Sequence, residues 1–312
     1  MIEIQSLTKT YGETRAVDGI SFTVQPGVVT GFLGPNGAGK STTMRMIIGL
    51  DRPTSGRALV NGRPYVDAPA PLAEVGALLD AKGVDKNRSA HNHLLALGAT
   101  IGIGARRVDE VLGVVGLSDV AGKAAGSFSL GMGQRLGIAA ALLADPEVLI
   151  LDEPVNGLDL DGIQWIRTLL TDLASEGRTV LLSSHLMSEM QLVAEHLIVI
   201  GRGHILADTT MGEFISSAST GAVEVVTPEV SRLTALLEAA GATVVAEDGL
   251  LTVTGTDAAS IGEAAHSHGL PLHQLHTVPT SLESAYQELT RDEVTYVGSS
   301  VHPTHHTEEA AA

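Results

Sequence analysis

Three stretches of the chain contain short apolar runs and predict strands, and the second is of the apolar type buried on both faces of a parallel sheet. They are Val28–Leu33, Glu147–Asp152 and Thr179–Ser184. Helical periodicity near residues 89–101 and 108–115 lies between the first two. We therefore predict an α/β domain over residues 1–215, with a mostly parallel sheet and a helical insertion at about residues 76–145.

Another long apolar run, LGIAAALLA over Leu136–Ala144, predicts a helix whose polar opening is the segment SLGMGQR. Ser129 is a suitable N-cap, and the exposed N–H groups of such a helix end form an anion site. Apart from Arg135, nothing adjoining this segment is suited to hold an anion. The remaining ligands must come from elsewhere in the chain or from another chain.

The pattern changes after about residue 214. Ala222–Thr227 alternates like a strand, and a helix, a hairpin, a second helix and a further strand follow over residues 228–278. This β-α-β-β-α-β order predicts a ferredoxin-like α+β accessory domain over residues 216–290. Thr280 and Glu283 fit a capping box for its last helix, and we expect residues 291–312 to be disordered.

Composition narrows the class of protein. The net charge is −17, and from Ala222 onward 13 acidic residues stand against two arginines. Such an acidic segment repels phosphate backbones, so nucleic acid is not an expected partner. No apolar run approaches the length of a membrane span, no secretory signal is present, and there is no cysteine. We expect a cytoplasmic protein.

The sequence that follows the first buried strand is suited to binding a triphosphate. Residues 34–42 read GPNGAGKST, which fits the pattern G-x-x-x-x-G-K-S. Glycines let backbone N–H groups turn toward the phosphates, and the helix that follows directs its positive end at them. Lys40 would contact the β- and γ-phosphates and Ser41 would bind Mg²⁺. The predicted nucleotide ligands are Gly34, Asn36, Gly37, Ala38, Gly39, Lys40, Ser41 and Thr42.

The second buried strand ends in two carboxylates, Asp152 and Glu153. Adjacent side chains on a strand point in opposite directions, so these two can do different work. Asp152 suits Mg²⁺, directly or through water, and Glu153 suits polarising the water that attacks the γ-phosphate. An ordinary acidic turn before Pro154 is the alternative.

With these motifs in order, the chain resembles the nucleotide-binding subunits of ATP-binding cassette (ABC) transporters. Residues 34–42 match the Walker A loop, 148–153 the Walker B strand and Asn156–Asp159 the D-loop. The resemblance implies that Tyr11 stacks on adenine with Val17 nearby, and that His185 contacts the γ-phosphate. A half-exposed tyrosine at a strand end and a structural histidine are the alternatives.

Phe128–Met132 resembles the family signature Leu-Ser-Gly-Gly-Gln, which closes over ATP held by the opposite subunit. The resemblance implies that Ser129, Gly131 and Met132 bind nucleotide across a homodimer. Leu130 and Met132 depart from the signature, and Asp80 stands where the family usually carries a glutamine that binds Mg²⁺. We predict that Asp80 binds Mg²⁺ in the closed state; a loop carboxylate facing solvent is the alternative.

These features predict an Mg²⁺-dependent ATPase subunit of an exporter, attached to a membrane permease at the inner face of the cell membrane. The motifs around Asp80 and Ser129 and the segment Ser281–Thr290 resemble those of drug and antimicrobial-peptide export ATPases. One alternative is a soluble cassette ATPase of translation or DNA repair, which usually has two cassettes or a long coiled coil. The other is a regulator without turnover, which would not need Glu153.

Overall fold

The computed structural model describes residues 1–80, 83–184, 187–217, 222–247, 249–278 and 281–290. Three of our predictions concern residues outside these ranges: the role of His185, the cap at Thr280 and the tail from residue 291. Within the described part of the chain, every helix is too short or too polar to span a lipid bilayer.

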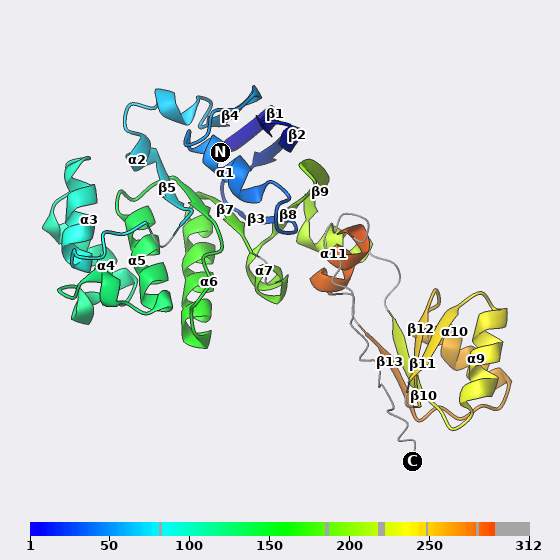
Figure 1. The fold of residues 1–312 in the computed structure, drawn as a ribbon. Coiled ribbons are helices and arrows are strands. Elements are labelled where there is room, and N and C mark those ends of the chain that lie inside the picture. Colours follow the sequence, from blue (N-terminus) through cyan, green and yellow to red (C-terminus); the bar gives the residue numbers. More distant parts are fainter. Residues whose placement is uncertain (81–82, 185–186, 218–221, 248, 279–280, 291–312) are drawn as a thin grey trace, which may run out of the picture.

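A six-stranded sheet lies at the centre of the N-terminal part of the chain (Figure 1). Its strand order is β5-β6-β7-β3-β8-β9, and only β9 is antiparallel to its neighbour. In β6 (Val148–Leu151), Val148 and Ile150 enter one hydrophobic cluster and Leu149 enters another. Both faces are therefore covered, which confirms the predicted parallel core. The other strands are β3 (Val29–Leu33), β5 (Val75–Leu78), β7 (Thr179–Ser183), β8 (His196–Gly201) and β9 (His204–Thr210).

An antiparallel sheet of three strands covers part of one face of the central sheet. Its order is β2-β1-β4, formed by β1 (Ile2–Tyr11), β2 (Thr14–Val24) and β4 (Ser55–Val60). Phe22 of β2 and Phe32 of β3 pack with ring centroids 5.5 Å apart, and α1 (Lys40–Ile47) contributes Met44 to the same cluster. The short helices η1 (Tyr65–Asp67) and α2 (Pro71–Glu74) lead on to β5.

The predicted helical insertion lies between β5 and β6. It contains α3 (Ala90–Ala99), α4 (Ala105–Val114) and α5 (Leu130–Leu142), with the short 3₁₀ helices η2 (Ser118–Val120) and η3 (Ala125–Ser127) before α5. We expected the insertion to begin near residue 76. Val75–Leu78 instead pairs in parallel with β6 as the edge strand of the central sheet, so the insertion starts beyond Leu78.

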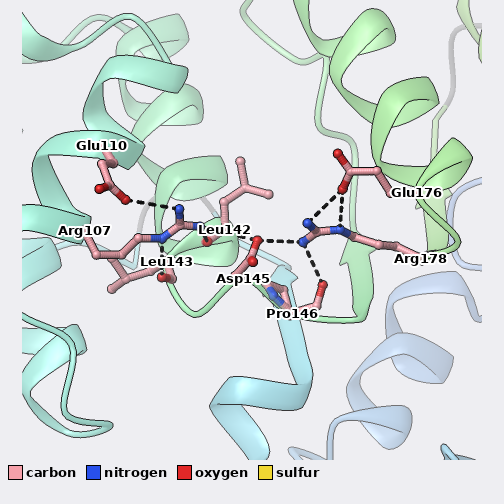
Figure 2. A network of polar contacts seen from close by, with 8 residues as sticks. All are labelled: Arg107, Glu110, Leu142, Leu143, Asp145, Pro146, Glu176 and Arg178. Atoms are coloured by element: carbon pink, nitrogen blue, oxygen red, sulfur yellow. Dashed lines mark hydrogen bonds and ion pairs between the residues drawn. The ribbon is translucent and has the colours of Figure 1, made fainter.

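A polar network joins the insertion to the core at the end of α5 (Figure 2). The Asp145 carboxylate lies 2.9 Å from a guanidinium nitrogen of Arg178 and 3.5 Å from one of Arg107 on α4. Arg107 also donates at 3.1 Å to the carbonyl of Leu142, the last residue of α5, which accepts a second hydrogen bond from the Asp145 N–H at 3.1 Å. Arg178, between α6 (Leu160–Ser175) and β7, donates to the Pro146 carbonyl at 3.2 Å. The network therefore ties the C-terminal end of α5 to the core beside β6.

The C-terminal domain has the predicted β-α-β-β-α-β order and its own hydrophobic cluster. Its antiparallel sheet runs β11-β12-β10-β13, the ferredoxin-like arrangement in which the first strand lies between the third and the fourth. Two helices pack on this sheet (Figure 1). The elements are β10 (Val223–Val226), α9 (Val230–Ala239), β11 (Thr243–Glu247), β12 (Leu250–Thr254), α10 (Ala258–Ser267) and β13 (Gln274–Thr277).

The last helix, α11 (Leu282–Thr290), does not pack with the accessory domain as we expected. It lies against α7 (Met187–Val193) and α8 (Met211–Ser217), and its Leu282 and Ala285 belong to the main cluster of the core. The Leu282 N–H donates to the Gln191 side chain on α7 at 3.3 Å. Burial raises the pKa of Tyr286 to about 12. The chain thus returns to the N-terminal domain after completing the accessory domain.

Candidate functional site

The loop between β3 and α1 is shaped by glycines at positions of close backbone approach. Gly39 is the N-cap residue of α1 with a φ of 112°, and a Cβ there would come within 2.6 Å of the Ala16 carbonyl oxygen. A Cβ on Gly34 would lie 2.3 Å from the Ile200 carbonyl oxygen. The loop can therefore follow this path only with glycine at both positions. The N-terminal end of α1 adjoins this loop, and the helix dipole stabilises an anion there.

Lys40, the first residue of α1, is folded back on this loop. Its Nζ donates hydrogen bonds to the Gly34 carbonyl at 2.6 Å and the Pro35 carbonyl at 3.2 Å, and the side chain is buried. Burial lowers the pKa of Lys40, whereas the negative charges of Glu153 and Asp152 act in the opposite direction. A bound polyphosphate would add negative charge and favour the charged form of this lysine.

Ser41 and Asp152 meet although they are far apart in sequence. The Ser41 hydroxyl donates to Asp152 Oδ2 at 2.6 Å, and the other carboxylate oxygen accepts a hydrogen bond from Ser183 at the end of β7. The hydroxyl and the carboxylate are both oxygen ligands of the kind that Mg²⁺ prefers. The structure thus brings together two of the three residues at which we predicted a metal ion.

Glu153 follows Asp152 in an unusual backbone conformation, with a φ of 52°. Its N–H donates to the Ser183 hydroxyl at 3.0 Å, and its carbonyl accepts a hydrogen bond from the Gln134 side chain on α5, also at 3.0 Å. Sequence reasoning missed both partners. The available signal was a polar residue, Gln134, in the first turns of a helix that is apolar further on, because a buried amide needs hydrogen-bond partners.

The glycine loop, the start of α1 and the two carboxylates border one cavity of about 270 Å³ at the carboxyl ends of β3 and β6. In α/β proteins with parallel sheets this is where ligands bind. All of its lining residues were predicted as site residues. They are Asn36, Gly37, Gly39, Lys40, Ser41, Thr42, Asp152 and Glu153.

Tyr11 and Val17 lie near this loop in different settings. Tyr11 ends β1 with 47% of its surface exposed, and its hydroxyl donates to Asp51 at 2.9 Å. The ammonium group of Lys9 lies 4.8 Å from the centre of the Tyr11 ring. Val17 is fully buried and would lie 3.1 Å from a Cβ on Gly39, so it supports the loop from beneath.

The segment at the start of α5 does not line this cavity. Ser129 is the N-cap residue, and its hydroxyl accepts a hydrogen bond from the Met132 N–H at 3.2 Å, as predicted for a helix cap. The Met132 side chain packs against the main hydrophobic cluster. Arg135 donates to the Val115 carbonyl at 3.0 Å and lies 4.6 Å from the centre of the Trp165 ring, so it braces helices instead of facing an anion.

Asp80 was the other predicted metal ligand. It is exposed and is not among the residues that line the cavity. His185 lies outside the described residues. Of the predicted metal ligands, Ser41 and Asp152 line the cavity and are hydrogen-bonded to each other.

The fold and the glycine loop define a P-loop nucleotide-binding protein. The family described as ABC transporter matches residues 17–156, and a domain of unknown function matches residues 221–283. The bacitracin transport ATP-binding protein BcrA of Bacillus licheniformis is 44% identical over 211 residues, 67% of this chain and 69% of that protein. The daunorubicin resistance ATP-binding protein DrrA3 of Streptomyces coeruleorubidus is 33% identical over 304 residues, 94% of this chain and 96% of that protein.

A solved ATP-binding subunit of an ABC transporter is also similar, with a TM-score of 0.64 and 26% identity over 69% of this chain and 92% of that chain. The chain belongs to the ATP-binding subunits of ABC transporters, and it is an ATPase of that class. This membership confirms the resemblance on which the sequence prediction depended.

Proposed function

We propose that the chain hydrolyses Mg²⁺-bound ATP as the energy-supplying subunit of an exporter. The observation that carries the proposal is that residues of the loop 36–42 and the carboxylates Asp152 and Glu153 line the same cavity. Its volume of about 270 Å³ lies just below the range of about 300–1,000 Å³ usual for small-ligand sites. It suits the phosphate groups of ATP, with the adenine placed beside Tyr11.

Each side chain at the cavity has a separate task in this proposal. Lys40 holds the β- and γ-phosphates, and Ser41 and Asp152 hold Mg²⁺, which would neutralise charge on the phosphate oxygens. Glu153 accepts a proton from the attacking water. His185 contacts the γ-phosphate, and Asp80 joins the metal ligands only when two chains close together.

Two copies of the chain close around two nucleotides in the proposed active state. Support comes from the start of α5, where Ser129 caps a helix whose end lies outside the cavity of its own chain. The two motifs also carry exposed leucines. Leu130 in the signature has 61% of its surface exposed, and Leu160, directly after the D-loop, has 84%. Apolar side chains this exposed favour burial in an interface.

The proposed cargo is a peptide antibiotic or a drug, moved through a separate membrane permease at the cytoplasmic face. The support is the names of the relatives: transport of bacitracin for BcrA, transport of a lantibiotic for SrtF of Streptococcus pyogenes, and daunorubicin resistance for DrrA3. The DrrA3 match extends through the accessory domain as well. None of these names points to translation or DNA repair.

Replacing Glu153 with glutamine tests the proposal. Phosphate release by the Glu153→Gln variant should fall by at least about 10²-fold, with ATP affinity retained and the dimer accumulating in light scattering. The control is Glu238→Gln, which removes an exposed carboxylate on α9 and should change neither readout. Undiminished phosphate release by Glu153→Gln would overturn the assignment of the base, and a protein that stays monomeric with ATP and Mg²⁺ would overturn the dimer.

A further inference from the structure

The backbone of Glu153 is held in a conformation that side chains other than glycine seldom adopt. Its φ of 52° places it in the left-handed region, one residue after the end of the Walker B strand. Such conformations persist only where the surroundings determine them, and they occur often at functional sites. The direction in which the Glu153 carboxylate leaves the backbone depends on this angle.

Two buried side chains from different elements bind the polar backbone groups of Glu153. Ser183, fully buried at the end of β7, accepts the hydrogen bond of the Glu153 N–H at 3.0 Å and donates to Asp152. Gln134, buried on α5, donates to the Glu153 carbonyl at 3.0 Å. The same carbonyl also accepts a hydrogen bond from the Asn156 N–H at 3.2 Å, which is a bond within the turn itself.

We propose that Gln134 and Ser183 are positioning residues that set the angle at which Glu153 presents its carboxylate. The proposal rests on the function of Glu153 proposed above. The turn bond to Asn156 closes the turn, whereas Gln134 and Ser183 fix the turn to α5 and β7. Without them the peptide groups on both sides of Glu153 can rotate toward a more common backbone conformation, and the carboxylate moves with them.

Gln134 also connects this angle to the signature segment. It lies on the same helix as Ser129, five residues further along the chain. In the closed dimer that helix end would cap the nucleotide of the partner. A displacement of α5 on contact with that nucleotide would therefore move the Glu153 backbone through the hydrogen bond from Gln134.

The test separates positioning from binding and from folding. Gln134→Met keeps the length of the side chain without its donor, Ser183→Ala removes the hydroxyl, and Ser183→Thr retains it. We expect kcat to fall by about tenfold or more in Gln134→Met and Ser183→Ala, since small misplacements of a catalytic group have effects of this size. KM for ATP should stay within about twofold in Gln134→Met, because Gln134 does not line the cavity, whereas Ser183 also donates to the proposed metal ligand Asp152. Ser183→Thr should recover most of the activity.

A matched control is Thr227→Val in the accessory domain, which removes an equally buried side chain that donates to the Pro271 carbonyl at 2.7 Å. It should lower the melting temperature without changing kcat. Adding Gln134→Met to Glu153→Gln should cause no further loss of phosphate release. If Gln134→Met fails to fold, the pair Ser183→Ala and Ser183→Thr decides the question.

Unchanged kcat in Gln134→Met and Ser183→Ala, or a rise in KM with kcat intact, would overturn the inference. That result differs from failure of the proposed function, which would appear as full activity in Glu153→Gln.

Discussion

Gly131 of the signature segment and Gly157 of the D-loop are in backbone contact within one chain. A Cβ on Gly131 would lie 2.6 Å from the Gly157 carbonyl oxygen, and Leu130 covers the position where a Cβ on Gly157 would be. Two motifs that the family resemblance assigns to the contact between subunits therefore form one continuous surface before any dimer is made. Displacing one of them displaces the other.

Gly131→Ala should disturb this surface. The added methyl group meets backbone, so the start of α5 or the D-loop must shift, and we expect ATPase activity of the dimer to fall by about tenfold or more. Gly133→Ala is the control, because a Cβ there has no heavy atom within 4 Å. In a helix that change adds about 1 kcal/mol of stability. Equal steady-state rates for the two variants would contradict the prediction.

Ser129→Ala removes the cap of α5. We expect it to lower the free energy of unfolding by about 1 kcal/mol and also to weaken ATP-dependent dimerisation, measured by light scattering. Ser89→Ala is matched to it, since Ser89 caps α3 with the same 3.2 Å hydrogen bond, from the Asn92 N–H. That variant should lose similar stability and dimerise normally. Loss of dimerisation in both variants would point to folding alone.

Two substitutions of Tyr11 distinguish the contribution of ring stacking to ATP binding from that of the hydroxyl hydrogen bonds. Tyr11→Phe loses the hydroxyl, with its hydrogen bonds to Asp51 and Thr42, and should bind ATP as the parent does, because the ring remains. Tyr11→Ala should weaken binding by about 5- to 150-fold, which corresponds to a stacking energy of about 1–3 kcal/mol. Fluorescence titration with a labelled nucleotide measures both. If the alanine variant binds normally, Tyr11 is a surface residue and no part of the site.

Asp80 is expected to act only in the closed state. Asp80→Ala should leave ATP affinity of the monomer unchanged and raise the Mg²⁺ concentration for half-maximal ATPase activity. Asp119→Ala removes an exposed carboxylate on the helical insertion and serves as a control for charge. An unaltered Mg²⁺ titration and rate in Asp80→Ala exclude the predicted role.

Arg178 is expected to matter for stability. Its side chain is 19% exposed and joins Asp145 and Glu176, each with a closest distance of 2.9 Å, to the core. Because the two carboxylates are largely exposed, we expect Arg178→Ala to cost about 1–2 kcal/mol in urea unfolding. Arg106→Ala breaks a surface pair with Glu110 and should cost less than about 0.5 kcal/mol. Similar losses in both variants would contradict the role given to the network.

Much of the fold follows from local patterns. Residues 34–42 predicted the loop and its helix, and alternation in residues 222–278 predicted the ferredoxin-like domain, because each is determined by neighbours in sequence. The position of α11 could not be predicted in this way. Its apolar face, with Leu282 and Ala285, fits any apolar surface, and the sequence period does not say which one.

The residues of the candidate site likewise fall into two groups, those that short sequence motifs predict and those that depend on tertiary packing. The cavity residues are carried by two short motifs whose chemistry can be recognised from residue types alone. The hydrogen bonds of Gln134 and Ser183 to Glu153 span 19 and 30 residues and depend on how a helix and a strand pack. Such partners become visible only once the tertiary contacts are known.

Because α11 packs on the N-terminal cassette, the accessory domain is an insertion, and the elements before and after it both belong to the cassette. The chain leaves from α8 and comes back to a helix that packs on α8. The entropy cost of closing a loop grows only slowly with its length, so the cost differs little between the whole domain and a short connector. A short connector could therefore replace the domain. Ending the chain at residue 217 is a different operation, because it would uncover Phe214 and Met211. A gene for the shortened cassette should therefore keep residues 282–290.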